Sequence, residues 1–506
     1  MCLQCSIGSA QIMRPTSLVI IDIDGLRRDV FLKALDAGEI PNIARIVGGR
    51  AATRACHVDA VSTAPSITFT AQASIVTGAH PRDHGIPGNE SFDRFGRISK
   101  GRPRHFGFDV GDTLAVDDAV AVFTNGLASR FLQDGTPTIY ETAAQRGVAS
   151  AVFYHMVARG AETWQPPNVV DIARFTKGRG VLAMEAGQYD AGMLKRLVRY
   201  LDTGHRPGVL MAYFMGLDHH SHGHGPASQP AYLRDVIDPQ VGLLLDALER
   251  HGMLSEALFV LVSDHGQVDA VPDDRHSLRL GFPFDLELVH VFNALGLDVH
   301  DIPGEDPNCD AVMGLNGGLA HVYLQRRDGR WADRPRYAAD VLPVAAAFHA
   351  MDAEGRYAEE LHDTLDAILI RNVERDGWEA EFAAYVGDGK TQPLADYLAA
   401  RPALSFVDPV NRLRCATGAS SGDLLLVAKG REGYYFGGMT RGVHGGLLSG
   451  ESDPVLTFGY PGGGDESVVW LQEVVAGVIG DRCANEGQRR ASVADMVPAT
   501  LAVLGW

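Results

Sequence analysis

Five short runs of mostly apolar residues recur along the chain, and each ends in a polar or glycine-containing turn. They are SLVIIDID (17–24), VASAVFY (148–154), GVLMAYF (208–214), ALFVLVSD (257–264) and PVLTFGYP (454–461). Because the apolar residues are continuous rather than alternating, the runs are typical of strands covered on both faces, as in a mainly parallel sheet. Stretches with helical spacing, such as YLRDVIDPQVGLLLDALERHG (232–252), lie between them. This alternation predicts a layered α/β/α fold with a mostly parallel central sheet.

The region 295–428 breaks this rhythm. It contains a segment rich in Gly, Asn and Asp, a charge-laced run (358–382) that we interpret as helical, and the strand-like GDLLLVAK (422–429). We interpret the region as an inserted, cap-like subdomain at the open edge of the sheet. The predicted division is therefore a catalytic core in two parts, 14–294 and 429–506, with the insertion between them.

Composition excludes several classes of partner. The chain has 506 residues, of which 46% are hydrophobic and 21% charged, and its net charge is −18. Such a charge argues against binding to a nucleic acid polymer or an anionic membrane surface. It leaves room for a small anionic substrate, because a bound metal ion can reverse the local field.

The six cysteines are few and scattered, which does not resemble a disulfide framework. Cys2 and Cys5 form a C-x-x-C motif, but no second pair accompanies it, so its role stays open. We find no signal peptide and no apolar run of the roughly 18 residues that a membrane span needs. The expectation is a soluble, cytoplasmic protein, and a homo-oligomer is left open.

Three acidic residues follow predicted strands. Asp24 ends the first run, Asp264 ends the fourth, and Asp218 follows the third after a short connection. A single aspartate after a strand is more often a helix N-cap, but ligands in open α/β sheets bind beyond the carboxyl ends of the strands. Histidines accompany two of the three acids, in DHG (264–266) and in GLDHHSHGHGP (216–226). The pattern favours a metal site at this edge of the sheet.

Carboxylate and imidazole are the ligands expected for zinc or a neighbouring first-row ion. Two divalent ions about 3.5–4 Å apart need ligands from several strand ends, and such pairs serve phosphoryl or sulfuryl transfer. Thr68 is a candidate nucleophile, because helical spacing begins near Ala71 and a helix N-terminus stabilises negative charge. The backbone N–H of Phe69 would hold phosphate oxygens. The alternative is that Thr68 only caps the helix.

These motifs together resemble the alkaline phosphatase superfamily, and within it the type I phosphodiesterase/nucleotide pyrophosphatase branch. They occur in the order IDIDGLRRD, T-F-x(4)-S-I-V-T-G-x(2)-P-x(2)-H-G-I-x(2)-N, D-x(3)-H-x(2)-G-P, SDHG and GVHGG. The C-terminal segment ASVADMVPATLAVLGW is also similar to the end of these domains. Single motifs of this kind are weak, whereas the ordered set is specific.

The resemblance implies a ligand set for two divalent metal ions, with zinc favoured and manganese as the alternative. One ion would be bound by Asp24, Thr68, Asp264 and His265, and the other by Asp218, His222 and His444. The resemblance also implies that Asn89, which is 89 − 68 = 21 residues after Thr68, binds the phosphate. It leaves His219, His220 and His224 as neighbours rather than ligands, and His84 as a structural residue.

The implied reaction is hydrolysis of a small phosphate ester through a covalent phosphothreonine. Met156 and Ala158 occupy positions where related monoesterases and phosphonate hydrolases often carry lysine, and Arg159 is the strong cation of that segment. Fewer cations suit a diester better than a dianionic monoester, so a phosphodiesterase or nucleotide pyrophosphatase is favoured. Arg159 would then contact the substrate, although Lys177 or the insertion could also supply charge.

Two alternatives remain open at this point. The first is a phosphomonoesterase or a phosphonoacetate-type hydrolase of the same superfamily. The second is an inactive binding protein on this scaffold, which is disfavoured because every ligand implied by the resemblance is present. A sulfatase is disfavoured too, because the sequence has no C-x-P-x-R or S-x-P-x-R segment.

Overall fold

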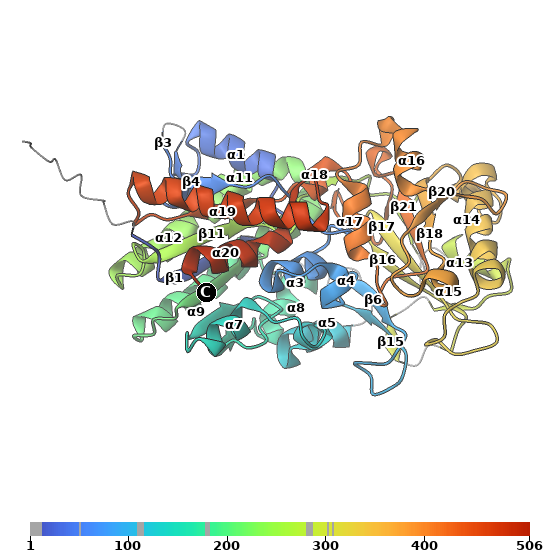
Figure 1. The fold of residues 1–506 in the computed structure, drawn as a ribbon, viewed down its shortest axis with the longest axis horizontal. Helices are drawn as coiled ribbons and strands as arrows, with labels where there is room; N and C mark the ends of the chain where they lie inside the picture. The colour runs from blue at the N-terminus through green and yellow to red at the C-terminus, as the bar shows by residue number, and fades with distance from the viewer. Residues whose placement is uncertain are drawn as a thin grey trace, which may run out of the picture.

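The protein forms two lobes that lie side by side along its long axis (Figure 1). The computed structural model describes residues 13–49, 52–108, 116–177, 183–279, 287–300, 303–305 and 308–506. Within these ranges each lobe is built on a seven-stranded sheet. Cys2 and Cys5 lie outside the described residues, and the four cysteines inside them are free thiols.

The first sheet carries the apolar runs expected from the sequence. Its strand order is β4-β24-β11-β1-β10-β8-β9. The central strand β1 (Ser17–Ile23) pairs in parallel with β10 (Val209–Phe214) and with β11 (Ala257–Val262). Every residue of β10 and β11 is buried, because both faces of the sheet are covered.

The outer strands of this sheet have both orientations. On one side β8 (Ser150–Phe153) and β9 (Thr163–Gln165) continue the parallel arrangement. On the other side β24 (Leu456–Gly459) is antiparallel to β11, and β4 (Ala55–His57) is antiparallel to β24. The prediction of an α/β fold with a mostly parallel central sheet is confirmed.

Two groups of helices cover this sheet. In one group α20 (Met496–Leu504) packs against both α3 (Thr68–Thr77) and α19 (Asp465–Glu486), and Figure 1 shows α19 directly above α20. In the other group α9 (Ala186–Asp202) packs against α12 (Asp238–Arg250). The side chains of α3 are buried along its whole length, so the helix that begins at Thr68 is held rigidly inside the lobe.

The helical stretch expected at 232–252 is divided into two parts. A π-helical turn (Leu233–Ile237) precedes α12, which has Pro239 in its first turn. Proline lacks an N–H group and therefore favours a helix start rather than an unbroken helix. The apolar residues that predicted α12 are all fully buried: Val241, Leu244, Leu245 and Leu248.

The second lobe draws its sheet from residues between Val299 and Ala428. Its strands run in the order β14-β16-β17-β21-β18-β19-β20. The centre is antiparallel: β16 (Ala311–Asn316) pairs with β17 (Leu319–Leu324), which pairs with β21 (Leu424–Ala428). One edge is formed by β14 (Val299–His300), and β19 (Ala383–Tyr385) leads to the other edge strand, β20 (Thr391–Pro393). The tight turn between β16 and β17 points to the first lobe and is important for the site described below.

The prediction of a helical run at 358–382 is wrong. This stretch forms a 3₁₀ turn (Glu359–Leu361), the strand β18 (Leu365–Ile370) and the short helix α15 (Val373–Asp376). The apolar run LDAILI is too short for a helix of ordinary length, and it is buried between β21 and β19. The short length and the burial of this run therefore explain why it forms a strand.

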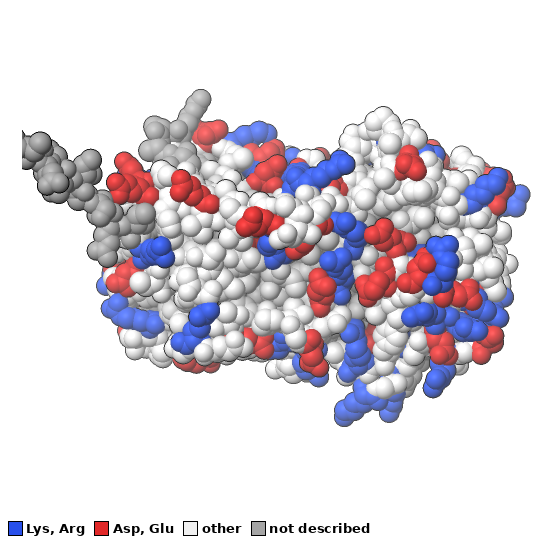
Figure 2. All heavy atoms as spheres, viewed as in Figure 1, with Lys and Arg blue, Asp and Glu red and all other residues white. Residues whose placement is uncertain are grey.

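The surface is mixed in charge. On the face shown in Figure 2, acidic and basic side chains are interspersed over both lobes, so the net charge of −18 is not gathered into one acidic patch there. No helix among the described residues is long and apolar enough to cross a membrane.

Candidate active site

The residues implied as metal ligands meet at the carboxyl ends of three neighbouring strands. Asp24 follows β1, and Asp264 and His265 follow β11. Asp218 and His222 lie one turn apart on α10 (Gly216–His224), which starts just after β10. His444 follows the short strand β23 (Gly442–Val443). The parallel sheet thus brings together groups that are far apart in the sequence.

One cluster consists of Asp24, Asp264 and His265, whose ligand atoms lie within 4.8 Å of one another. The His265 Nε2 atom is 3.2 Å from Asp264 Oδ2 and 3.6 Å from Asp24 Oδ1. The Thr68 hydroxyl contacts the same nitrogen at 3.1 Å. The structure therefore places a threonine oxygen at the edge of a group that can bind a metal ion.

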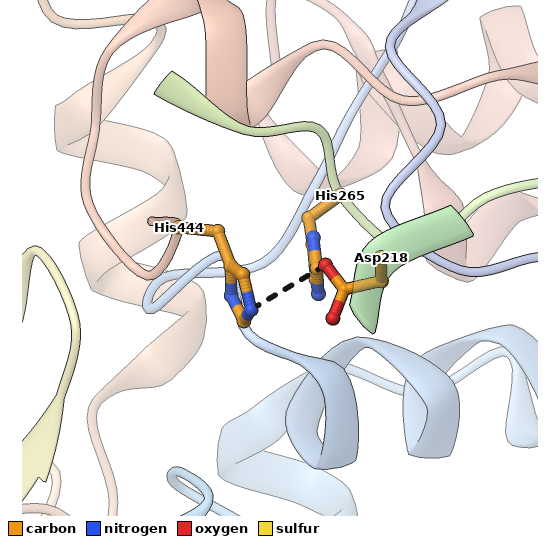
Figure 3. Close-up of side chains that lie close together, drawn as sticks. All are labelled: Asp218, His265 and His444. Atoms are coloured by element: carbon orange, nitrogen blue, oxygen red, sulfur yellow. Dashed lines mark ion pairs between the residues drawn. The ribbon is translucent and has the colours of Figure 1, made fainter. Parts of the chain in front are cut away.

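The second cluster consists of Asp218, His222 and His444. His222 Nε2 is 3.1 Å from Asp218 Oδ2 and 3.2 Å from His444 Nε2. Asp218 and His444 face each other across 3.8 Å, with the ring of His265 beside them (Figure 3). The rings of His265 and His444 are stacked at 3.7 Å, so the two clusters adjoin.

Each of the three histidines presents the same nitrogen to its cluster. The Nδ1 atom donates to a backbone carbonyl, which is that of Gly266 for His265, Gly442 for His222 and Ser66 for His444. A carbonyl can only accept, so Nδ1 carries the proton and Nε2 is left as an acceptor. This is the arrangement in which protein histidines bind metal ions.

The carboxylates fit a cation. Asp24 Oδ1 and Asp264 Oδ2 are buried and have no hydrogen-bond partner among the described residues. Burial, followed by the negative charges of Asp264 and Asp218, raises the pKa of Asp24 well above its usual value. Burial also raises the pKa of Asp264. Closely spaced acids of this kind are stabilised in the ionised form by a divalent ion.

The neighbouring histidines have the opposite effect on the pKa of Asp218. Burial would raise the pKa of this acid, but His222, His444 and His265 together hold it below its usual range. The pKa of His444 lies well below normal, chiefly because the ring is buried and secondly because His265 is close. Neutral imidazole and ionised carboxylate are the ligand forms that bind zinc.

Thr68 is the first residue of α3, and the N-cap position is taken by Ile67. The Thr68 hydroxyl contacts His265 instead of capping the helix. Asn89 Oδ1 accepts the backbone N–H of Phe69 at 3.0 Å. The Phe69 N–H, which we expected to hold phosphate oxygens, is thus engaged by Asn89, whose Nδ2 amino group is the donor that can face the phosphate.

A cavity of about 360 Å³ opens beside Thr68. Asn89, Asp24, Asp218, His222 and His444 line its polar side. The remaining wall is largely aromatic and thioether: Phe69, Phe108, Phe123, Phe175, Tyr213, Met156, Met215 and Met439. Within the described part of the chain, no lysine or arginine lines it.

Several residues singled out in the sequence lie elsewhere. Arg159 is held by the Glu141 carboxylate and the carbonyls of Leu132 and Thr136, so the structure does not bring it to the cavity. The side chain of Lys177 lies outside the described part.

The three histidines of α10 and its C-terminal end that are not implied as metal ligands have different surroundings. His219 lines the cavity, where its ring packs on Phe175 at 4.2 Å. His220 and His224 stack on each other on the outer side of the helix. His84 is buried and contacts Ser74, in agreement with a structural role.

Two contacts of the ligand carboxylates were missed by the sequence analysis. The Tyr213 hydroxyl donates to Asp24 Oδ2, and the Gln267 amide donates to the backbone carbonyl of Asp218 at 3.1 Å and to its carboxylate. Tyr213 is a polar group within an apolar strand, and Gln267 directly follows the DHG motif. Each of these positions stands out in the sequence, but the sequence does not show which carboxylate the side chain contacts.

Asp190 of α9 holds the start of α10. Its Oδ1 atom accepts the backbone N–H of Gly216 at 3.1 Å, and burial raises the pKa of its carboxyl to about 8. Asp190 is therefore protonated in the folded protein and ionised in the unfolded chain between about pH 4 and pH 8. The free energy of unfolding should fall as pH rises through this window, by at most about 1.4 kcal/mol per pH unit.

The variant Asp190→Asn should lose this slope, because asparagine keeps an oxygen acceptor but does not ionise. The measurement is chemical unfolding of both proteins at saturating metal, from pH 5 to pH 8. The stability of the variant relative to the native protein should increase steadily with pH. Parallel pH profiles would show that Asp190 titrates normally.

Comparisons with known proteins identify the family of the chain. The family model for type I phosphodiesterase/nucleotide pyrophosphatase matches residues 18–388. An uncharacterized pyrophosphatase/phosphodiesterase of Schizosaccharomyces pombe is 26% identical over 286 residues, which are 54% of this chain and 49% of the relative. The chain thus spans about half the length of this curated relative.

Solved structures show the same fold. Murine ectonucleotide pyrophosphatase/phosphodiesterase 5 has a TM-score of 0.52 and 14% identity, with 88% of each chain covered. An inactive variant of that murine protein in complex with AMP gives the same values. The human protein is 13% identical with the same TM-score, covering 88% of this chain and 87% of its own. Because the family model spans most of the chain, the protein belongs to the type I phosphodiesterase/nucleotide pyrophosphatase family.

Proposed function

We propose that the protein is a metal-dependent phosphodiesterase of the nucleotide pyrophosphatase type that forms a covalent phosphothreonine on Thr68. The observation that carries this proposal is the contact of the Thr68 hydroxyl with His265, where two clusters of mostly buried carboxylate and imidazole groups adjoin. Few other reactions require a hydroxyl nucleophile between two cation sites.

Two divalent ions would be held by the chain's own side chains. We assign Asp24, Thr68, Asp264 and His265 to one ion and Asp218, His222 and His444 to the other. When bound, such ions lower the pKa of a coordinated hydroxyl and stabilise charge on the leaving oxygen. The mixed nitrogen and oxygen donors favour zinc, with manganese as the alternative.

The remaining steps are performed by protein groups. The Thr68 Oγ1 atom gives up its proton to solvent and forms a bond to phosphorus as the bond to the leaving oxygen breaks, which gives a phosphothreonine that still carries the second ester group of the diester. Water then breaks the bond between Oγ1 and phosphorus, which regenerates the hydroxyl and releases a phosphate monoester. Asn89 Nδ2 donates to an equatorial phosphate oxygen, and its orientation is fixed because Oδ1 accepts the Phe69 N–H.

The cavity supports a diester as substrate. A monoanionic diester needs fewer cationic partners than a dianionic monoester, and the described lining has no lysine or arginine. The rings of Phe69 and Phe108 lie 4.9 Å apart, and Phe175 forms a further part of the wall. These surfaces suit a flat aromatic group such as a nucleobase. The structural relative that binds AMP is consistent with this choice.

A comparison of substrates tests the proposal. The metal-loaded protein should hydrolyse bis(p-nitrophenyl) phosphate and a nucleoside 5′-(p-nitrophenyl) diester with kcat/KM at least about tenfold above that for p-nitrophenyl phosphate or phosphonoacetate, a difference of about 1.4 kcal/mol. Elemental analysis should find close to two ions per chain. A preference for the monoester or for phosphonoacetate would assign another branch of the superfamily, and a protein without metal or turnover would be a binding scaffold.

A further inference from the structure

We propose that Asn316, the last residue of β16 before the turn to β17 in the second lobe, is a positioning residue that holds Asn89 in place relative to His444. This inference rests on the proposed function, because it takes Asn89 as the phosphate donor and His444 as a metal ligand. It assigns to the second lobe a part in building the site rather than covering it.

The amide of Asn316 binds the backbone next to Asn89. Asn316 is fully buried, and its Oδ1 atom accepts the N–H of Glu90 at 3.1 Å. Its Nδ2 atom donates to the carbonyls of Glu90 and Gly314, both at 3.1 Å. One side chain thus satisfies both backbone groups of Glu90, the residue that immediately follows Asn89, so the backbone there cannot rotate without breaking two hydrogen bonds.

The same segment is held at two further points. A Cβ atom on Gly88 would lie 2.3 Å from Asn316 Oδ1, so the Asn316 amide packs directly on the backbone that precedes Asn89. His321 of β17 contacts the carbonyl of Pro87 through Nε2 at 3.3 Å, while its Nδ1 accepts the Gly422 N–H. Residues of one hairpin therefore contact the chain on both sides of Asn89.

The other side of the turn contacts His444. The N–H of Gly318 donates to the His444 carbonyl at 3.0 Å. A Cβ atom on Gly317 would lie 1.8 Å from that carbonyl oxygen, and one on Gly445 would lie 1.9 Å from the Asn316 carbonyl oxygen. Gly317 and Gly445 both have positive φ, at 64° and 102°. The backbones are in direct contact, so a shift of the turn must move His444 as well.

The turn is thus shared by a phosphate donor and a metal ligand that belong to different segments of the first lobe. Asn89 reaches Thr68 through the Phe69 N–H, and His444 adjoins His265. A displacement of about 1 Å between groups that act on one phosphate can reduce turnover about 10²-fold. Asn316 touches neither the substrate cavity nor a metal ligand side chain among the described contacts, so its effect would pass through Asn89.

The variant Asn316→Ala tests this role. The β16–β17 ladder extends from Ala311 and Leu324 to the turn and keeps its backbone pairing, so the second lobe should remain folded. We expect kcat for bis(p-nitrophenyl) phosphate to fall about 10²-fold while the metal content per chain is unchanged. The control Asn372→Ala removes the cap of α15 in the same lobe and should leave kcat unchanged.

A double-mutant cycle separates positioning from general destabilisation. If Asn316 acts through Asn89, the variant Asn89→Ala/Asn316→Ala should be no more than about twofold slower than Asn89→Ala alone. Multiplicative losses in the double variant would overturn the proposal, as would an effect of Asn316→Ala no larger than that of Asn372→Ala. The variant Gly88→Ala pushes on the Asn316 amide from the Asn89 side and should show the same loss, which provides the test if Asn316→Ala does not fold.

A second measurement distinguishes failure of the role of Asn316 from failure of the proposed function. Binding of inorganic phosphate to the metal-loaded protein, measured by calorimetry, does not depend on turnover. Phosphate affinity should decrease at least about tenfold in Asn316→Ala or Gly88→Ala and remain native in Asn372→Ala. If the native protein cleaves no ester, the proposed function fails, and equal phosphate affinity in all four proteins would then also overturn the inference.

Discussion

Replacement of Thr68 by alanine should reduce turnover of the diester by about 10⁴-fold or more, because the substitution removes the oxygen that forms the covalent bond to phosphorus in the proposed reaction. The two clusters around it keep their carboxylate and imidazole groups, so close to two ions should still be bound per chain. The measurement combines steady-state kinetics with elemental analysis of the same sample. Thr77→Ala is a matched control, because Thr77 ends the same helix and its hydroxyl donates to the Ala73 carbonyl and accepts the Ala79 N–H, away from the two clusters.

Trapping of the intermediate gives an independent readout. Rapid acid quenching of the native protein with the diester substrate should yield a peptide in which Thr68 carries the phosphoryl group together with its remaining ester group, and the Thr68→Ala protein should yield none. Turnover of Thr68→Ala within tenfold of the native rate would refute the nucleophile assignment. A loss of activity together with a loss of metal would instead assign Thr68 a role in binding the ion alone.

Asp24→Asn should have opposite effects on stability with and without metal. In the metal-free protein the substitution removes one of the mutually repelling buried charges, so the free energy of unfolding should rise by roughly 1–3 kcal/mol. In the metal-loaded protein it removes a ligand, so the variant should be less stable than the native protein by several kcal/mol, or about the contribution of one bound ion.

The measurement is chemical unfolding in excess chelator and in excess zinc. Asp274→Asn serves as the control, because Asp274 is exposed and its ion-pair partner in the described part of the chain is Arg279, and its effect should stay within about 0.5 kcal/mol in both conditions. If Asp24→Asn is destabilising to the same extent with and without metal, the Asp24 charge is compensated by the protein itself and the proposed ion site is wrong.

The sequence predicted the first lobe better than the second for a physical reason. Strands such as β1 and β11 are buried on both faces and are therefore continuous apolar runs that stand out in the sequence. The strand β18 lies in a charge-laced stretch, and it is held in place by its pairing with β21 on one side and β19 on the other. Tertiary context of that kind cannot be read from local spacing.

The candidate site residues show the same difference between positions set by local elements and positions set by tertiary contacts. Asp24, Asp218 and Asp264 lie where the strand ends place them, because the carboxyl edge of a parallel sheet is set by local elements. Arg159 was expected at the substrate because of its charge, yet Glu141 holds it elsewhere. Tyr213 and Asn316 act on groups 189 and 226 residues distant in the sequence, and no local pattern reports such contacts.

The glycine-lined contact between the lobes limits how this enzyme can be trimmed or recombined. Excision of 295–428 would remove the hairpin and leave the backbones around Gly88 and Gly445 without the surface on which they rest. A smaller catalytic fragment would therefore need a replacement hairpin of the same shape. For chimaeras between relatives, the crossover points should keep the hairpin together with the two loops that it touches.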